Sequence, residues 1–154
     1  MTYQCGEEVL RSQPFSHVLM DDALSKVCDF CLRCPENDKS TALKCCSKCK
    51  LVNFCQKTCL ENAWKSYHKQ ECKCLRKFSA NKCNIPQDIV RLLARIIFKL
   101  QKGGGHEEFE ILPNGRKRYF KDLMSHKEEI MKSADSLKGF RHIYSELQKY
   151  MVIK

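Results

Sequence analysis

The sequence has no hydrophobic run long enough to cross a membrane. Its most apolar stretch, residues 89–100, is interrupted by Arg91, Arg95 and Lys99, whereas a membrane-spanning helix needs about 20 predominantly apolar residues. The N-terminus also lacks the basic region, the apolar region and the cleavage site that make up a signal peptide. We therefore expect no membrane partner, and we predict an intracellular protein of the nucleus and cytoplasm.

Features of a disordered or repetitive chain are missing too, since the sequence has no internal repeat and no long low-complexity tract. Of its 154 residues, 43% are hydrophobic and 30% are charged, which is typical of a soluble globular protein. Cysteine, by contrast, is abundant, with twelve in all. Where thiols stay reduced, clustered cysteines indicate metal binding rather than a disulfide framework.

The net charge of +10 is spread unevenly along the chain. Residues 1–27 carry two basic and four acidic side chains, whereas residues 28–77 carry eleven against five and residues 78–154 carry fifteen against nine. Such a surface can attract nucleic acid through its phosphates, without base specificity. The simpler interpretation is that the lysines among the cysteines are only solvated, so nucleic acid is a weak candidate partner. The lysines concerned are Lys44, Lys48, Lys50, Lys57, Lys65 and Lys69.

The pattern of the sequence divides the chain into three parts, residues 1–27, 28–74 and 84–154. The first part contains a turn and a short strand-like run within residues 6–19. The second part holds most of the cysteines. The third part has helical periodicity, so we predict a mainly α fold in which a small zinc-stabilised module precedes a three-helix bundle.

Three amphipathic helices are predicted in the third part. The first begins near Asp88 and ends at residues 103–105, because three consecutive glycines lose too much backbone entropy to continue a helix. The others cover about 118–132 and 134–151, and Asn114-Gly115 forms a turn in the preceding loop. Apolar residues recur at helical spacing in each helix, and we expect them to be core residues: Ile89, Leu92, Leu93, Ile96, Ile97 and Leu100; Phe120, Leu123, Met124, Ile130 and Met131; Leu137, Phe140, Ile143, Tyr144, Leu147, Tyr150 and Met151.

Eight candidate metal ligands fall into four pairs: Cys28/Cys31, Cys46/Cys49, Cys55/Cys59 and His68/Cys72. A C-x2-C turn can bring two thiolates to about 2.3 Å from one zinc ion. Side chains four residues apart lie on one face of a helix and can do the same. Eight ligands form two tetrahedral sites, which are closed to water and therefore structural.

Helix geometry limits which pairs can share a metal ion. If residues 58–72 are mostly helical, Cys59 and His68 lie about 13 Å apart along the helix axis. One zinc ion cannot bind both, so the third and fourth pairs belong to different sites. The two sites must then be interlocked, in either a crossed or a nested arrangement.

Other cysteines and histidines are weaker candidates. Cys34 is also in C-x2-C register with Cys31, and Cys45 could replace Cys46. We predict ordinary thiols or ordinary polar side chains at the remaining positions: Cys5, Cys34, Cys45, Cys74, Cys83, His17, His106, His126 and His142. We expect Trp64 to pack against the zinc core, with an exposed peptide anchor as the alternative.

The motifs CDFC, CSKC, NFCQKTC, AWKSYH and HKQEC together resemble the MYND zinc finger, whose ligands are six cysteines, a histidine and a last cysteine. The flanking segments GEEVLRSQPF, ECKCL and IPQDIVRLLARIIFKL resemble the SMYD family of SET- and MYND-domain protein-lysine methyltransferases. This resemblance implies the crossed arrangement. Cys28, Cys31, Cys55 and Cys59 would bind one zinc ion, and Cys46, Cys49, His68 and Cys72 the other.

The resemblance also implies what each part of the chain is. Residues 1–27 would be a remnant of the N-terminal SET half, residues 28–74 a MYND-type zinc finger, and residues 84–154 the helical SET insert. The family's catalytic SET core carries an Asn-His-Ser-Cys motif, which these 154 residues do not contain. We therefore assign no catalytic and no cofactor-binding residue, and expect S-adenosylmethionine only in a full-length relative.

The function that this resemblance implies is a zinc-dependent protein-interaction module. Its expected partners are proline-containing peptide segments, with histone or chromatin proteins as further candidates. Two alternatives stay open: an active S-adenosylmethionine-dependent protein-lysine methyltransferase, as the full-length relative would be, and a basic zinc module that contacts nucleic acid.

Overall fold

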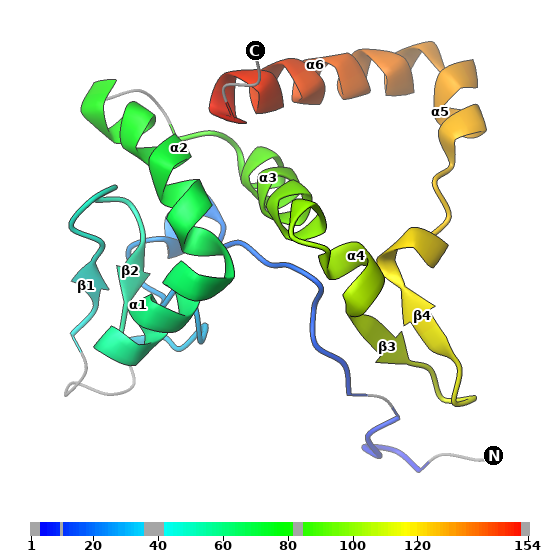
Figure 1. Cartoon of the computed structure of the whole chain (residues 1–154), viewed down its shortest axis with the longest axis horizontal. Coiled ribbons are helices and arrows are strands. Elements are labelled where there is room, and N and C mark those ends of the chain that lie inside the picture. Colours follow the sequence, from blue (N-terminus) through cyan, green and yellow to red (C-terminus); the bar gives the residue numbers. More distant parts are fainter. Residues whose placement is uncertain (1–3, 10, 36–41, 82–84, 152–154) are drawn as a thin grey trace.

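A computed structural model describes residues 4–9, 11–35, 42–81 and 85–151, and its mainly helical fold agrees with the prediction. Figure 1 shows a cysteine-rich finger on one side, a central helix, and a β-hairpin on the other side. A long C-terminal helix runs back from the hairpin side across the central helix. An extended N-terminal segment joins the finger to the hairpin end. No helix in the described part of the chain is both long enough and apolar enough to cross a membrane.

The finger combines a two-stranded hairpin with a long helical run. Strand β1 (Lys44–Cys45) pairs antiparallel with strand β2 (Asn53–Phe54). Three helical segments then follow without a break: α1 (Lys57–Ala63), the π-helical turn η3 (Trp64–His68) and α2 (Lys69–Asn81). π-Helical turns are rare and often occur at functional sites, and this one contains the predicted ligand His68.

The helical region begins with α3 (Asp88–Gln101). Gly103 adopts a left-handed φ of 91° and ends the helix as predicted, whereas Gly104 already belongs to the next helix. The remaining elements follow in chain order: α4 (Gly104–Glu107), β3 (Phe109–Ile111), β4 (Lys117–Tyr119), the 3-10 turn η4 (Phe120–Asp122), α5 (Lys127–Lys132) and α6 (Ala134–Met151).

The predicted helix over residues 118–132 is wrong in its first half. That half contains the end of β4 and η4, and only α5 is α-helical. The turn at Asn114-Gly115 was predicted correctly, but it joins β3 to β4 instead of lying in an unpaired loop. Cross-strand contacts such as the ion pair between Arg118 and Glu110 stabilise this hairpin. Such contacts depend on the strand register, which the helical spacing of apolar residues does not reveal.

The predicted strand-like run within residues 6–19 forms no strand among its described residues, 6–9 and 11–19. Its later part instead lies along α3. Three basic residues of α3 each donate a hydrogen bond to alternate carbonyl groups of the segment: Lys99 to Phe15 at 2.7 Å, Arg95 to His17 at 2.6 Å and Arg91 to Leu19 at 2.7 Å. The carbonyl groups of the segment and the basic residues of the helix are spaced alike, because two residues of extended chain span about 6.6 Å and four residues of a helix rise about 6 Å.

The buried face of α3 differs from the predicted apolar stripe. Ile89 is 39% exposed, and the other stripe positions are only partly buried. Two of the five buried residues of α3 are arginines: Val90, Arg91, Ala94, Arg95 and Phe98 are the buried set. The spacing of apolar residues did not predict this face, because an arginine can be buried only where partners distant in sequence satisfy its charge.

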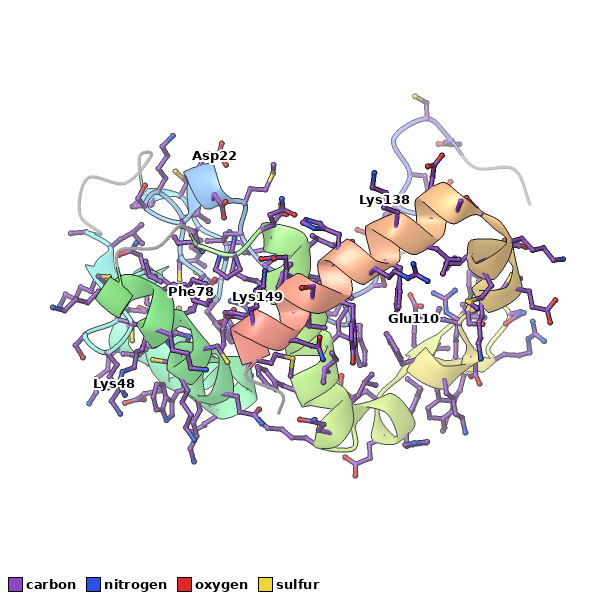
Figure 2. The ribbon with its side chains drawn as sticks, turned by 90° about the horizontal axis from the view of Figure 1, so that it is seen from above. Asp22, Lys48, Phe78, Glu110, Lys138 and Lys149 are labelled. Carbon is purple, nitrogen blue, oxygen red and sulfur yellow. The ribbon has the colours of Figure 1, made fainter. Side chains whose placement is uncertain are left out.

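Helix α6 crosses over α3, and only its C-terminal end is buried (Figure 2). Leu147 and Tyr150 lie in the core, and the Tyr150 ring centroid is 5.8 Å from that of Phe78 on α2. The predicted core role is wrong for several residues nearer the start of α6 and before it, which are exposed: Leu123, Met124, Ile130, Met131, Phe140 and Tyr144.

Candidate metal centre

The structure brings the eight predicted ligands together as two groups of four. One group, which we call the all-cysteine site, contains Cys28, Cys31, Cys55 and Cys59. The other, which we call the histidine site, contains Cys46, Cys49, His68 and Cys72. The first pair of ligands therefore lies with the third and the second with the fourth, which is the crossed arrangement.

The distances between the potential ligand atoms fit tetrahedral zinc. Four sulfur atoms at about 2.3 Å from one ion would lie about 3.8 Å from one another. In the all-cysteine site, Sγ–Sγ distances are 3.6 Å for Cys31 to Cys55 and 3.5 Å for Cys55 to Cys59. In the histidine site, the distances are 4.0 Å for Cys46 Sγ to Cys72 Sγ and 3.8 Å for Cys49 Sγ to His68 Nε2. All eleven cysteines of the described residues are free thiols.

Thiol ionisation within each site also indicates a cation. Burial works against ionisation of Cys28 and Cys46, yet hydrogen bonds from neighbouring backbone N–H groups, joined at Cys46 by His68, outweigh it and lower the pKa of both thiols to about 7. Burial raises the pKa of Cys49, and nearby Cys46 and Cys72 raise it further. Burial and Cys46 likewise raise the pKa of Cys72 to about 11. One thiolate per site forms readily, but several side by side need a positive ion such as zinc to stabilise them.

A buried carboxylate lies behind the histidine ligand. Glu71 Oε2 is 3.5 Å from His68 Nδ1, while His68 Nε2 faces the thiol of Cys49. Burial raises the pKa of Glu71, but Arg95 and His68 outweigh it and lower that pKa, so Glu71 is ionised. A carboxylate at Nδ1 favours the histidine tautomer whose Nε2 lone pair is available to a metal ion.

Arg95 of α3 connects this carboxylate to a second one. Its guanidinium binds Glu71 at 2.7 Å and Asp29 at 2.9 Å, and all three side chains are almost completely buried. Tyr67 completes the cluster, because its hydroxyl donates to Asp29 Oδ2 at 3.0 Å and its ring lies 4.0 Å below the Arg95 guanidinium. We call Asp29, Tyr67, Glu71 and Arg95 the buried ionic cluster.

Sequence reasoning missed the buried ionic cluster. It counted Asp29 and Glu71 only as charges, and it treated Arg95 as a residue that interrupts an apolar run. One signal was available, since Arg91, Arg95 and Lys99 recur every four residues and therefore share a helix face. Basic residues in this pattern can line a face that binds backbone carbonyl groups.

The remaining candidates lie apart from the two sites. Cys5 and Cys45 are exposed, Cys34 is partly buried and Cys74 is buried, while Cys83 lies outside the described residues. The six lysines of the finger named as a possible nucleic-acid surface are all exposed, as solvated lysines are.

Trp64 packs against the core, as expected, but keeps part of its surface exposed. Its ring centroid lies 5.8 Å from that of His68 in an edge-to-face arrangement. Lys48, at the outer edge of the finger in Figure 2, places its ammonium group 4.7 Å from the indole centroid. The indole is therefore accessible next to a solvated charge.

Comparison with known proteins agrees with this geometry. Residues 28–72 match the MYND finger family. Similar proteins include histone-lysine N-methyltransferase SMYD3 of Homo sapiens, 33% identical over 95% of this chain and 30% of that protein. N-lysine methyltransferase SMYD2-B of Danio rerio is 28% identical over 94% of this chain and 31% of its own length. The chain thus spans about a third of the length of these relatives.

Proposed function

From its membership of the SMYD family, with a MYND finger at residues 28–72, we propose that this chain acts as a zinc-dependent protein-interaction module. Its partners would be proline-containing peptide segments of other proteins, including histone or chromatin proteins. The observation that carries the proposal is a finger organised around two closed metal sites, with a partly exposed tryptophan beside them. Closed sites have no open position for a catalytic water, so their role is structural.

The face around Trp64 is the proposed peptide surface. Proline-rich peptides dock on exposed aromatic rings, and their preformed extended conformation loses little entropy on binding. Trp64 is held in place by its contact with the His68 ring, so removal of the metal ions would also disorder the surface. Lys48 beside the indole would favour peptides with an acidic residue near the proline.

Replacing Trp64 with alanine should weaken binding of a proline-rich peptide about tenfold or more, because a tryptophan anchor carries much of the energy of a small interface. The measurement is fluorescence anisotropy of a panel of labelled proline-rich peptides, some with a neighbouring glutamate. Tyr144→Ala is the matched control, since Tyr144 is an exposed aromatic residue that stacks on Phe140 of its own helix, α6.

Native mass spectrometry of the Trp64→Ala variant should still find two zinc ions, which separates loss of the surface from loss of the metal sites. Stripping zinc from the wild-type chain should abolish peptide binding. Equal affinity before and after zinc removal would refute the proposed function.

Methyl transfer is a second candidate for the whole protein, because the relatives are named as lysine methyltransferases. We expect the 154 residues alone to be inactive, because the catalytic motif of the family is not among them. Incubation of the purified chain with histones and S-adenosylmethionine carrying a labelled methyl group tests this. Incorporation of label at a level above that of a heat-denatured sample would contradict it.

Two further expectations stand as proposals. We propose an intracellular location, in the nucleus and cytoplasm, for a module whose reduced cysteines bind zinc. Contact with nucleic acid through the exposed lysines is the weaker proposal, and such binding would fall steeply as salt is raised.

A further inference from the structure

The side chain of Arg95 joins three parts of the chain that are distant in sequence. Its Nε donates to Glu71 at 2.7 Å, its Nη2 donates to both Glu71 and Asp29, and its Nη1 donates to the carbonyl of His17 at 2.6 Å. Arg95 belongs to α3, outside the finger, yet it is only 2% exposed. All three guanidinium nitrogens are therefore occupied by acceptors from the finger and the N-terminal segment.

Through side-chain contacts, the cluster continues to the histidine site. It adjoins the all-cysteine site through the chain, because Asp29 lies between the ligands Cys28 and Cys31. Glu71 Oε2, which accepts a hydrogen bond from Arg95 at 2.8 Å, also faces Nδ1 of His68. His68 Nε2 in turn faces Cys49 inside the histidine site. Among the contacts of the described residues, no side chain of the buried ionic cluster reaches a thiol of the all-cysteine site.

Without Arg95, two buried carboxylates would lose their shared cation. Glu71 is fully buried, so without the two hydrogen bonds from Arg95 its carboxyl group would reorient or admit water. Either change removes the fixed acceptor at His68 Nδ1. The position of the histidine ring, which must aim Nε2 at the metal ion, would then be less well determined.

We propose that Arg95 is a positioning residue for the histidine site: from a helix outside the finger, it holds Glu71 against His68 and so controls how firmly this site retains its metal ion. The helical region thereby regulates one metal site of the finger selectively. This inference rests on metal binding at the two sites and is independent of the peptide surface around Trp64.

The test loads the whole chain with cadmium-113 and follows metal loss to excess EDTA by NMR. The all-cysteine and histidine sites give separate resonances, because sulfur and nitrogen ligands shift cadmium differently, so each site reports on itself. Arg95→Met should accelerate loss from the histidine site about 10- to 100-fold, the usual effect of losing an outer-sphere partner on metal affinity. Loss from the all-cysteine site should accelerate much less, because Asp29 adjoins Cys28 in the chain but its carboxylate binds Arg95 and Tyr67 and not a thiol.

Arg91→Met is the matched control. Arg91 is also fully buried on α3 and bound to Asp21 and to the carbonyl of Leu19, but it does not contact Glu71. Both sites of this variant should lose cadmium at the wild-type rate. Arg95→Lys, which keeps the charge without the forked geometry, should be intermediate at the histidine site.

Two results would overturn the proposal. One is equal acceleration at both sites of Arg95→Met, which is what general unfolding would produce. The other is an unchanged rate at the histidine site of Glu71→Gln, which keeps the shape of Glu71 but removes the charge that Arg95 binds. Selective loss in both variants supports the proposal.

Discussion

Replacing Cys46 with serine is expected to leave about one zinc ion per chain and to unfold much of the finger. Cys46 is buried in the histidine site, and its backbone also supports the hairpin through a hydrogen bond to Val52 at 2.9 Å. A structural zinc ion contributes on the order of 10–16 kcal/mol to folding in small peptides, so the loss of one ligand has a large effect. Native mass spectrometry gives the zinc count, and far-UV circular dichroism follows the helical run from α1 to α2.

The matched control for this change is Cys34→Ser. Cys34 has the same C-x2-C spacing to Cys31 that a ligand would have, but it lies in neither group of four. This variant should therefore keep two zinc ions and the wild-type spectrum. Two zinc ions in Cys46→Ser would show that the assignment of the histidine site is incorrect.

Replacing Asp29 with alanine is expected to destabilise the zinc-loaded chain by about 3–5 kcal/mol, the usual effect of removing one partner of a buried ion pair. Asp29 is fully buried, and its carboxylate is bound by Arg95 and by the hydroxyl of Tyr67. Without it, Arg95 keeps one carboxylate, Glu71, and part of the guanidinium lies unsatisfied in the interior. Urea unfolding, followed by tryptophan fluorescence of the single Trp64, measures the difference.

Asp21→Ala provides a matched comparison on the same helix. Asp21 binds Arg91 at 2.8 Å, but its side chain is 58% exposed. Arg91 itself is buried, but water can replace the exposed Asp21 carboxylate, and Arg91 keeps its hydrogen bonds to the carbonyl groups of Leu19 and Pro86. This variant should therefore lose clearly less stability than Asp29→Ala. Equal destabilisation by the two variants would mean that burial of the Asp29 pair is not what gives it its strength.

The pairing of the candidate metal ligands could be predicted from the sequence because the information that defines each pair is local. A C-x2-C turn or an i,i+4 pair places two ligands by itself, and helix geometry separates Cys59 from His68. Spacing alone left crossed and nested arrangements open. The fold resolves this choice, since the hairpin of β1 and β2 brings the second pair beside the C-terminal half of the helical run.

The connection between the finger and α3 could not be predicted in the same way. Arg91 and Arg95 have the sequence character of surface residues, and their burial depends on Asp21, Asp29 and Glu71, which lie 24 to 70 residues away. The prediction of a helix over residues 118–132 was wrong for a related reason. Phe120 has helical spacing to other apolar residues, but in the structure its ring stacks on Phe15 at 4.6 Å.

The central claim is that the eight ligands bind two metal ions in the crossed arrangement. The most direct test is a proton–cadmium-113 correlation spectrum of the cadmium-loaded chain, because scalar coupling links each metal ion to the β-protons of its own cysteines. We predict two cadmium resonances, one correlated with Cys28, Cys31, Cys55 and Cys59 and the other with Cys46, Cys49, Cys72 and the ring protons of His68. A single bound ion, or one cadmium correlated with both Cys28 and Cys72, would contradict it.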